Sequence, residues 1–290
     1  MKYAYYPGCS LHSTGTEFDE SFKAVCQSLG IELEEVPGWL CCGTSPAHST
    51  SRLLSLAMPM KNLVLAERTK LEEMVVPCAA CFSRFKIALY EIGEDEELRK
   101  DVDEVVGSSF QGQIHVIHPL EMFDRVDSGT LRSHVKRDLS DLKVACYYGC
   151  LLTRPPKAAQ FDVCEYPVTM DRVLQSVGIP TVDWSYKTEC CGGVFSLTET
   201  DIVLKLVNDI FNEAKAVGAD AIAVACPLCH ANLDTRLTEI EEKYGVDYGN
   251  MPTFYFTQLM GLAFGLSHKE LALGKHIVNP EPLLRERVPA

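Results

Sequence analysis

The sequence is short of positive charge and contains no long hydrophobic run. It has 27 lysines and arginines against 40 aspartates and glutamates, which gives a formal net charge of −13 at pH 7. Nucleic acids and anionic membrane surfaces both attract a basic protein face, so we expect neither as a partner. No run approaches the roughly 18 apolar residues of a transmembrane helix, and no apolar signal-peptide region follows Met1. We therefore expect a cytoplasmic protein without membrane insertion.

Several cofactor motifs are also missing. There is no Gly-x-Gly-x-x-Gly, no Walker A loop and no His-Glu-x-x-His, so nucleotide binding and zinc-protease activity lack support. The ferredoxin run Cys-x₂-Cys-x₂-Cys-x₃-Cys-Pro is absent as well. Electrons for any redox reaction must then come from a partner.

Cysteine, in contrast, is abundant, at 13 of 290 residues. This fraction lies below the roughly 8–10% of a disulfide scaffold, and the number is odd. In a reducing compartment, clustered cysteines are more often metal ligands or redox groups than structural bridges. The composition therefore indicates metal or thiol chemistry.

Ten of the cysteines follow one pattern twice. Each copy has a single cysteine, then Cys-Cys-Gly, then Cys-x-x-Cys, with gaps of 31 and 35 residues in the first copy and 39 and 34 in the second. Tyr5-Tyr6-Pro7-Gly8 before the first cysteine matches Tyr147-Tyr148-Gly149 in the second copy. The two sets are Cys9, Cys41, Cys42, Cys78 and Cys81, and Cys150, Cys190, Cys191, Cys226 and Cys229. We interpret this as an internal duplication.

Residues 1–127 and 142–290 form the two predicted domains, and the polar stretch 128–141 is the predicted linker. The segment 279–282 near the end is expected to be a surface tail or a docking arm.

Within each copy, strands alternate with helices, which predicts an α/β fold with a mostly parallel sheet. The single cysteines and the Cys-x-x-Cys motifs come just past the carboxyl ends of expected strands, the edge at which open α/β sheets bind ligands. All five cysteines of a copy can therefore converge. The expected strands are 3–6, 31–36 and 74–76, then 142–148, 179–184 and 221–225, and the main expected helices are 51–70, 170–177, 199–217 and 228–244.

Three chemistries suit such cysteines. Zinc is commonly held by four thiolates, but each copy offers five and the zinc-ribbon spacing is absent. A dithiol redox motif would use Cys-x-x-Cys but leaves the other six cysteines unexplained. Iron–sulfur clusters normally have thiolate ligands, and five thiolates suit a cluster that takes more than four ligands. The spacing favours iron–sulfur and leaves zinc and dithiol chemistry open.

The duplicated Cys-x₃₁₋₃₉-Cys-Cys-Gly-x₃₃₋₃₄-Cys-x-x-Cys pattern resembles the CCG cysteine-rich domain family; the 39-residue gap in the second copy is at the long limit of that form, and 35 residues separate Cys42 from Cys78. In its two-copy form, with Lys275-His276-Ile277-Val278-Asn279-Pro280 near the end, the chain resembles the B subunit of heterodisulfide reductase. The resemblance implies two noncubane [4Fe-4S] clusters and two domains related by pseudo-twofold symmetry. Each cluster would have as ligands the five cysteines of one set.

The same resemblance implies an activity and partners. The family's archaeal members reduce the mixed disulfide of coenzyme M and coenzyme B in methanogenesis, together with a ferredoxin-like C subunit and an FAD-containing A subunit. CCG domains also occur in enzymes that oxidise glycolate, lactate and succinate. The expected function is therefore reduction of a small-molecule disulfide at the ten cluster cysteines. The alternative is an electron-transfer or structural subunit of a sulfur- or hydroxy-acid-oxidising complex, with zinc in one copy.

Other residues receive weaker interpretations. Cys26, Cys146 and Cys164 lie outside the pattern, and the first two are expected to be buried and inert. His12, His48 and His230 are more simply structural or surface residues than proton donors. Gly43 and Gly192-Gly193 are expected to allow close approach of substrate to the clusters. Basic side chains expected to hold acidic groups of the substrate are Arg84, Arg154 and Lys187. His118-Pro119 is expected to begin a helix, as is the run 94–97.

Overall fold

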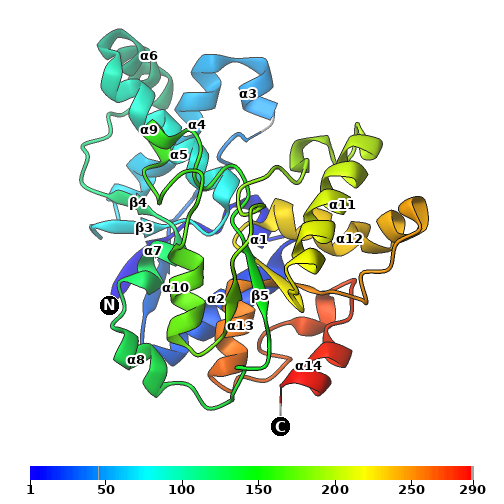
Figure 1. The fold of residues 1–290 in the computed structure, drawn as a ribbon. Helices are drawn as coiled ribbons and strands as arrows, with labels where there is room; N and C mark the ends of the chain where they lie inside the picture. The colour runs from blue at the N-terminus through cyan, green and yellow to red at the C-terminus, as the bar shows by residue number, and fades with distance from the viewer. Residues whose placement is uncertain (45, 289–290) are drawn as a thin grey trace.

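Two four-stranded parallel sheets form the centre of the computed structural model, which describes residues 1–44 and 46–288 (Figure 1). The strand order is β2-β1-β3-β4 in the first sheet and β6-β5-β7-β8 in the second, and every pair is parallel. Since the second order repeats the first with each number raised by four, the duplicated α/β fold predicted from the cysteine pattern is confirmed.

The elements follow the same sequence in both halves. The first half contains β1 (Lys2–Tyr5), α1 (Gly8–Leu11), α2 (Thr16–Ser28), β2 (Glu32–Glu35), α3 (Pro46–Thr50), α4 (Arg52–Glu67), β3 (Glu73–Val75), α5 (Ala79–Glu94), α6 (Glu96–Val106), β4 (His115–Ile117), α7 (Pro119–Asp124) and α8 (Ser128–Ser133). The second contains β5 (Val144–Tyr147), α9 (Pro156–Ala159), α10 (Thr169–Ser176), β6 (Thr181–Val182), η1 (Gly193–Phe195), α11 (Thr200–Ala216), β7 (Ala221–Val224), α12 (Pro227–Tyr244), β8 (Thr253–Tyr255), α13 (Phe256–Ala263), η2 (Leu273–Lys275) and α14 (Glu281–Arg287).

Local sequence explains many of the boundaries. The acidic run 94–97 does begin a helix, because the Asp95 carboxylate accepts hydrogen bonds from two free amides at the start of α6, those of Glu97 and Leu98. The strand β8 and helix α13 were not predicted. Every residue of α13 is buried, so its sequence lacks the alternation of polar and apolar positions that reveals a helix.

The halves pack around a pseudo-twofold axis. Helix α2 of the first half packs on α13 of the second, and their counterparts α10 and α7 pack on each other in the same way. At the first contact the rings of Phe18 and Tyr255 stack at 4.4 Å, and the hydroxyls of Ser21 and Thr257 lie 2.7 Å apart. Burial is continuous across the contact, so both sheets share one core.

The segments outside the two repeats are also packed. In the stretch 128–141, Leu131 and Leu139 are buried and the Lys136 amide donates to the Ala263 carbonyl. We retain this stretch as the proposed domain boundary. The segment 279–282, expected to be a surface tail or a docking arm, is anchored and not a free tail: Asn279 and Pro282 are exposed, but Pro280 is buried, as are Val278 and Leu284 on either side, and α14 lies against the second half (Figure 1). None of the helices in the described ranges combines the length and apolar character needed to cross a bilayer.

His118 joins the two sheets at their carboxyl ends. It caps α7 as predicted: its Nδ1 accepts from the Leu120 amide, which leaves the proton on Nε2. That Nε2 lies 2.9 Å from the Pro77 carbonyl and 3.3 Å from the Ala225 carbonyl. These carbonyls come from equivalent positions of the two halves, immediately before the two Cys-x-x-Cys motifs. One buried imidazole therefore holds both motifs.

We expect His118→Ala to lower the free energy of unfolding by about 2–4 kcal/mol. The change leaves buried carbonyls without a donor, which costs about 1–3 kcal/mol, and removes a helix cap worth about 1 kcal/mol. Urea denaturation under anaerobic conditions measures this. The control is His115→Ala, three residues earlier on the exposed side of β4, with an expected change within about 0.5 kcal/mol. Equal losses from both variants would contradict the bridging role.

The stability should also depend on pH through His118. Burial lowers the pKa of its imidazole to about 4, against about 6.5 in the unfolded chain. Between these values only the unfolded state binds the proton, so the free energy of unfolding decreases as the pH falls from 6.5 towards 4 and is unaffected above 6.5. Urea titrations between pH 7.5 and 5 should give a steeper decrease for the natural protein than for His118→Ala; parallel curves would refute this.

Candidate functional site

The fold brings the cysteines of each set to one edge of one sheet. Cys78 and Cys226 occupy the N-cap positions of α5 and α12, directly after β3 and β7. Cys81 and Cys229 follow in the first turn of the same helices, where hydrogen bonds with neighbouring thiols and burial raise the pKa of each well above its usual value. The single cysteines follow β1 and β5, and the double cysteines lie in the loops after β2 and β6. The convergence predicted from strand ends is present in both halves.

Each set consists of a buried trio and a more accessible pair. The buried thiols are Cys42, Cys78 and Cys81 in the first half and Cys191, Cys226 and Cys229 in the second. The accessible ones are Cys9 and Cys41, and Cys150 and Cys190. A group bound by five such sulfurs would be held from the protein interior and would remain reachable from one side.

The sulfurs are close together, and the double-cysteine loops hold them in the same way. Cys42 and Cys81 lie 3.1 Å apart, and their counterparts Cys191 and Cys229 lie 3.5 Å apart. The amide of Gly43 donates to the Cys41 sulfur, and the amide of Gly192 to Cys190, at 3.4 and 3.3 Å.

These glycines are needed for the loop itself. Both have positive φ, of +78° and +74°, and a Cβ on Gly43 would come within 2.9 Å of Ala47 and Met58. A Cβ on Gly192 would meet Val203 at 3.2 Å. Each glycine thus faces the packed helix behind the loop, while its amide lies against a cysteine sulfur and Gly192 also lines the pocket beside the second set. Close approach of substrate at these glycines stays a prediction.

Two tyrosines support the loops, a role that the sequence analysis missed. The Tyr6 hydroxyl donates to the Leu40 carbonyl and the Tyr147 hydroxyl to the Glu189 carbonyl, in each case just before the double cysteine. Tyr6 therefore corresponds to Tyr147, whereas the sequence comparison paired Tyr5 with Tyr147. The signal was available, because each of these tyrosines stands three residues before its single cysteine.

Hydrogen bonds among the thiols lower the pKa values of some cysteines and raise those of their partners. Bonds from Cys41 and Cys81 lower the pKa of Cys42 to about 3, and the bond from Cys150 lowers the pKa of Cys190 to about 6. The same bonds raise the pKa of Cys41 and Cys150 well above the usual value. The thiols thus compete for negative charge, and five adjacent thiolates require a cationic group between them.

The two sets meet at the pseudo-twofold axis. The Cys78 and Cys226 thiols hydrogen bond to each other, which raises the pKa of Cys78 and contributes to the lowered pKa of Cys226. These residues directly follow the carbonyls that His118 holds. The two candidate sites are therefore neighbours across the boundary between the halves.

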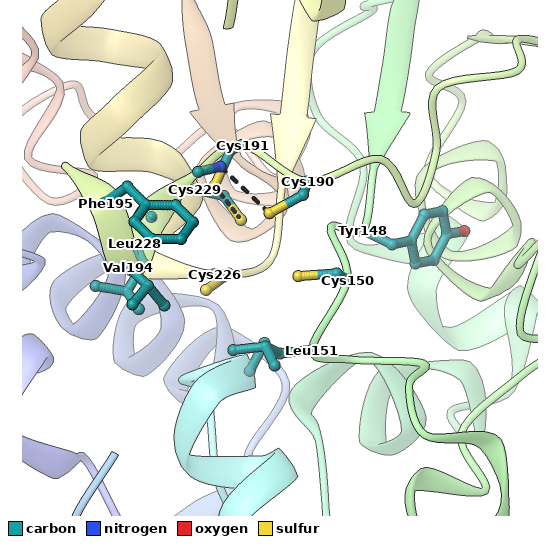
Figure 2. A pocket seen from close by; sticks show the side chains of 13 residues that line it. Tyr148, Cys150, Leu151, Cys190, Cys191, Val194, Phe195, Cys226, Leu228 and Cys229 are labelled. Atoms are coloured by element: carbon teal, nitrogen blue, oxygen red, sulfur yellow. Dashed lines mark hydrogen bonds between the residues drawn. The ribbon is translucent and has the colours of Figure 1, made fainter. Parts of the chain in front are cut away.

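The second set surrounds a pocket of about 120 Å³ (Figure 2). The sulfurs of Cys150, Cys190, Cys226 and Cys229 gather around one space, while the ring of Tyr148 points away from it. Pockets for drug-sized ligands measure roughly 300–1,000 Å³, so this space suits a group of a few heavy atoms. Its remaining wall is apolar and comes from both halves: Ala79, Leu151, Val194, Phe195 and Leu228.

The donor set fits an iron–sulfur cluster in both halves. Five thiols without disulfides match the thiolate ligation of such clusters, and those of the second set lie beside an apolar wall. The cysteines that would hold a cluster are the five of each set. The three remaining cysteines take no part: Cys26 and Cys146 are buried in the core, as predicted, and Cys164 is partly exposed.

The basic residues predicted to bind substrate have different positions. Lys187 is 2% exposed, with its ammonium 3.0 Å from the Asp171 carboxylate, so its prediction as a substrate ligand is wrong. Arg154 pairs with Glu165 and also donates to the Thr188 carbonyl, near Cys190. Arg84 lines a groove of about 460 Å³ between the halves, together with His48, Arg52 and Pro155.

The histidines are mostly structural, as expected. His230 is buried and its Nε2 donates to the Thr253 carbonyl. His12 packs against Trp39 at the surface. His48 is exposed in the groove that contains Arg84.

The chain resembles known proteins over nearly its whole length. A membrane anchor subunit of 8-methylmenaquinol:fumarate reductase from Wolinella succinogenes is 30% identical, covering 97% of this chain and 99% of that one. The B subunit of ferredoxin:CoB-CoM heterodisulfide reductase from Methanosarcina mazei is 29% identical over 96% and 94%. Lactate utilization protein A from Bacillus cereus is 22% identical over 85% and 95%.

A solved structure shares the fold. The crystal structure of a hypothetical protein from Helicobacter pylori superimposes with a TM-score of 0.78 at 14% identity. The match covers 96% of this chain and 52% of the other, so the chain spans about half the length of that protein.

The sequence profile of the cysteine-rich CCG domain matches twice, at residues 3–86 and 144–234. These matches contain all ten cysteines of the two sets. The chain therefore belongs to the CCG cysteine-rich domain family.

Proposed function

We propose that this chain is the disulfide-reducing subunit of a heterodisulfide reductase-type complex, with a noncubane [4Fe-4S] cluster in each half. The observation that carries the proposal is that His118 Nε2 lies 2.9 Å from the Pro77 carbonyl and 3.3 Å from the Ala225 carbonyl, each directly before the Cys-x-x-Cys motif of one set, which makes the two cysteine sets neighbours. Cleaving a disulfide requires two electrons, and a site with two adjacent one-electron carriers meets that requirement. The name of the Methanosarcina mazei relative supports the same activity.

The reaction balances with an external electron source. A disulfide R–S–S–R′ accepts two electrons and two protons, its S–S bond breaks, and two thiols leave. When bound, iron–sulfur clusters supply electrons one at a time. The electrons come from a partner that carries one-electron centres, which we propose to be a ferredoxin-like subunit associated with an FAD-containing subunit.

The residues of the chain orient the reaction. Leu151, Val194 and Phe195 form an apolar wall beside the accessible cysteines of the second set, and the exposed Val194 and Phe195 offer an apolar surface to a substrate that reaches these sulfurs. The groove that contains Arg84 and Arg52 offers positive charge to acidic groups of a substrate. Arg84 stands three residues after Cys81 on α5, a rise of about 4.5 Å along the helix.

The compartment follows from the same thiols. All 13 cysteines are free, and ten of them must stay reduced to bind clusters. We therefore place the protein in the cytoplasm, where thiols are kept reduced.

The alternative is an electron-transfer or structural subunit of another oxidoreductase complex, with zinc in one cysteine set. The fumarate reductase and lactate utilization relatives support this alternative. Four of the five sulfurs in either set would satisfy zinc. Metal analysis separates the two: the proposal requires about eight irons per chain, four for each cluster, whereas the alternative requires about four.

We expect Cys191→Ser to remove the second cluster and to leave the first in place. Cys191 lies in the buried trio of the second half, and its sulfur is 3.5 Å from Cys229, so it belongs to one set alone. Iron and sulfide should fall to about half per chain. The matched control is Cys164→Ser, outside both sets, with unchanged iron. Loss of both clusters from a chain that remains folded by circular dichroism would contradict two separate sites.

The activity itself is tested with electron donors and disulfides. The purified chain should reduce a disulfide substrate with an artificial one-electron donor and be inactive with NADH. Substrate should also perturb the paramagnetic spectrum of at least one partly reduced cluster, more than an inert analogue of the same charge does. Turnover with NADH alone would overturn the need for a partner. Unchanged spectra at saturating substrate would mean that the clusters only conduct electrons.

A further inference from the structure

A buried group of metal-binding side chains lies on the inner side of α12, apart from the cysteine sets. One nitrogen from each of His230 and His276 and one carboxylate oxygen of Asp234 lie within 4.8 Å of one another. The Glu17 carboxylate, from α2 of the first half, approaches to 3.6 Å from His230 Nδ1. All four side chains are at most 8% exposed.

The hydrogen bonds indicate which nitrogen of each histidine is free. His230 Nε2 lies 3.1 Å from the Thr253 carbonyl, so it carries the proton and leaves a lone pair on Nδ1. The Gln258 amide is oriented by two bonds, from its nitrogen to the Leu271 carbonyl and from the Tyr255 amide to its oxygen. His276 Nε2 lies 2.9 Å from the Gln258 nitrogen and 3.1 Å from its oxygen, so a proton on Nε2, the tautomer that metal binding at Nδ1 requires, has an acceptor in place.

In this metal-binding tautomer both Nδ1 atoms are acceptors, and they face further acceptors. His276 Nδ1 has no hydrogen-bond partner although it is buried, and it points to Asp234 Oδ1 at 3.9 Å. The two Asp234 oxygens accept from the backbone amides of Ile277 and Val278, which holds the carboxylate in place. Two imidazole nitrogens and two carboxylates thus lie together with only the Tyr255 hydroxyl as a nearby donor, beside Glu17, and buried carboxylates need a partner of positive charge.

We propose that His230, His276, Asp234 and Glu17 bind a zinc ion. Zinc takes four ligands at about 2.0–2.1 Å, which places tetrahedral ligand atoms about 3.4 Å apart. The separations of 3.6 Å between Glu17 and His230 and of 3.9 Å between His276 and Asp234 approach this spacing. Glu17 lies outside the group of three ligands within 4.8 Å, so its carboxylate moves inward to complete the site. Two neutral imidazoles and two carboxylates leave the zinc site without net charge. The bonds from Thr253 and Gln258 to the far nitrogens are the supports that metal-binding histidines usually have.

The ion would join three distant parts of the chain. Glu17 comes from the first half, His230 and Asp234 from the helix that begins with two cluster cysteines, and His276 from the C-terminal segment. Its position gives it a structural role, because the site is enclosed and has no open coordination position. This zinc differs from the alternative considered above, in which zinc replaces a cluster among the cysteines.

The test is zinc analysis and zinc-edge X-ray absorption on the full chain, purified anaerobically. We expect about one zinc per chain, with nitrogen and oxygen ligands near 2.0 Å and no sulfur near 2.3 Å. His276→Gln keeps a polar group for Gln258 but removes the Nδ1 ligand, and it should lose the zinc while retaining its iron. The matched control, His268→Gln, changes a half-exposed histidine on the same segment and should keep both.

Each other outcome is decisive. The proposal would be overturned if the chain contains no metal other than the cluster iron, if His276→Gln retains its zinc, or if the zinc has sulfur ligands. An additional iron that His276→Gln removes would support the site and correct the ion. If His276→Gln does not fold, Glu17→Gln on the opposite half should lower zinc without lowering iron, and unchanged zinc there refutes the role of Glu17. Failure of disulfide reduction would leave these results unaffected.

Discussion

Ten thiols held at one boundary cannot all be ionised unless cations lie among them, and this constraint organises the rest of the structure. Sulfur–sulfur separations of 3.1 and 3.5 Å would be repulsive between thiolates. Two kinds of group oppose this repulsion: the amides that donate to Cys41 and Cys190, and the N-termini of the two helices that begin at the Cys-x-x-Cys motifs. Both stabilise negative sulfur, the form that binds iron, whereas the apolar wall makes an uncompensated thiolate costlier.

The duplication places these features twice and brings the two sets together. Because α2 packs on α13 and α10 on α7, the carboxyl ends of both sheets face the same boundary. A single copy would leave those helix faces and the sulfur pocket open on one side, since Ala79 of the first half closes the pocket of the second. The shared core is therefore a condition for two enclosed sites and follows from the repeat itself.

The sequence predicted the parts of the structure that depend on local pattern. The strand ends, most of the helices and the convergence of the cysteines follow from periodicity and from the rule that parallel strands end at one edge. It could not predict contacts between distant segments, such as the Cys78–Cys226 pair or the burial of Lys187 against Asp171. Helix α13 was not predicted because it is buried on all sides. The packing of the C-terminal segment was not predicted because its contacts are with Asp234, more than 40 residues away in the chain.

The position of His118 shows what joining two copies in one chain makes possible. Its Nε2 contacts equivalent carbonyls of both halves, so it lies close to the pseudo-twofold axis. The matching N-cap in the second half is Tyr255, which stacks against Phe18 and His230 instead. In a dimer of identical chains, any side chain that reaches the axis meets its own copy there. A fused chain escapes this restriction: it can place one unpaired group at the centre of an otherwise symmetric site, and so give two similar halves different tasks.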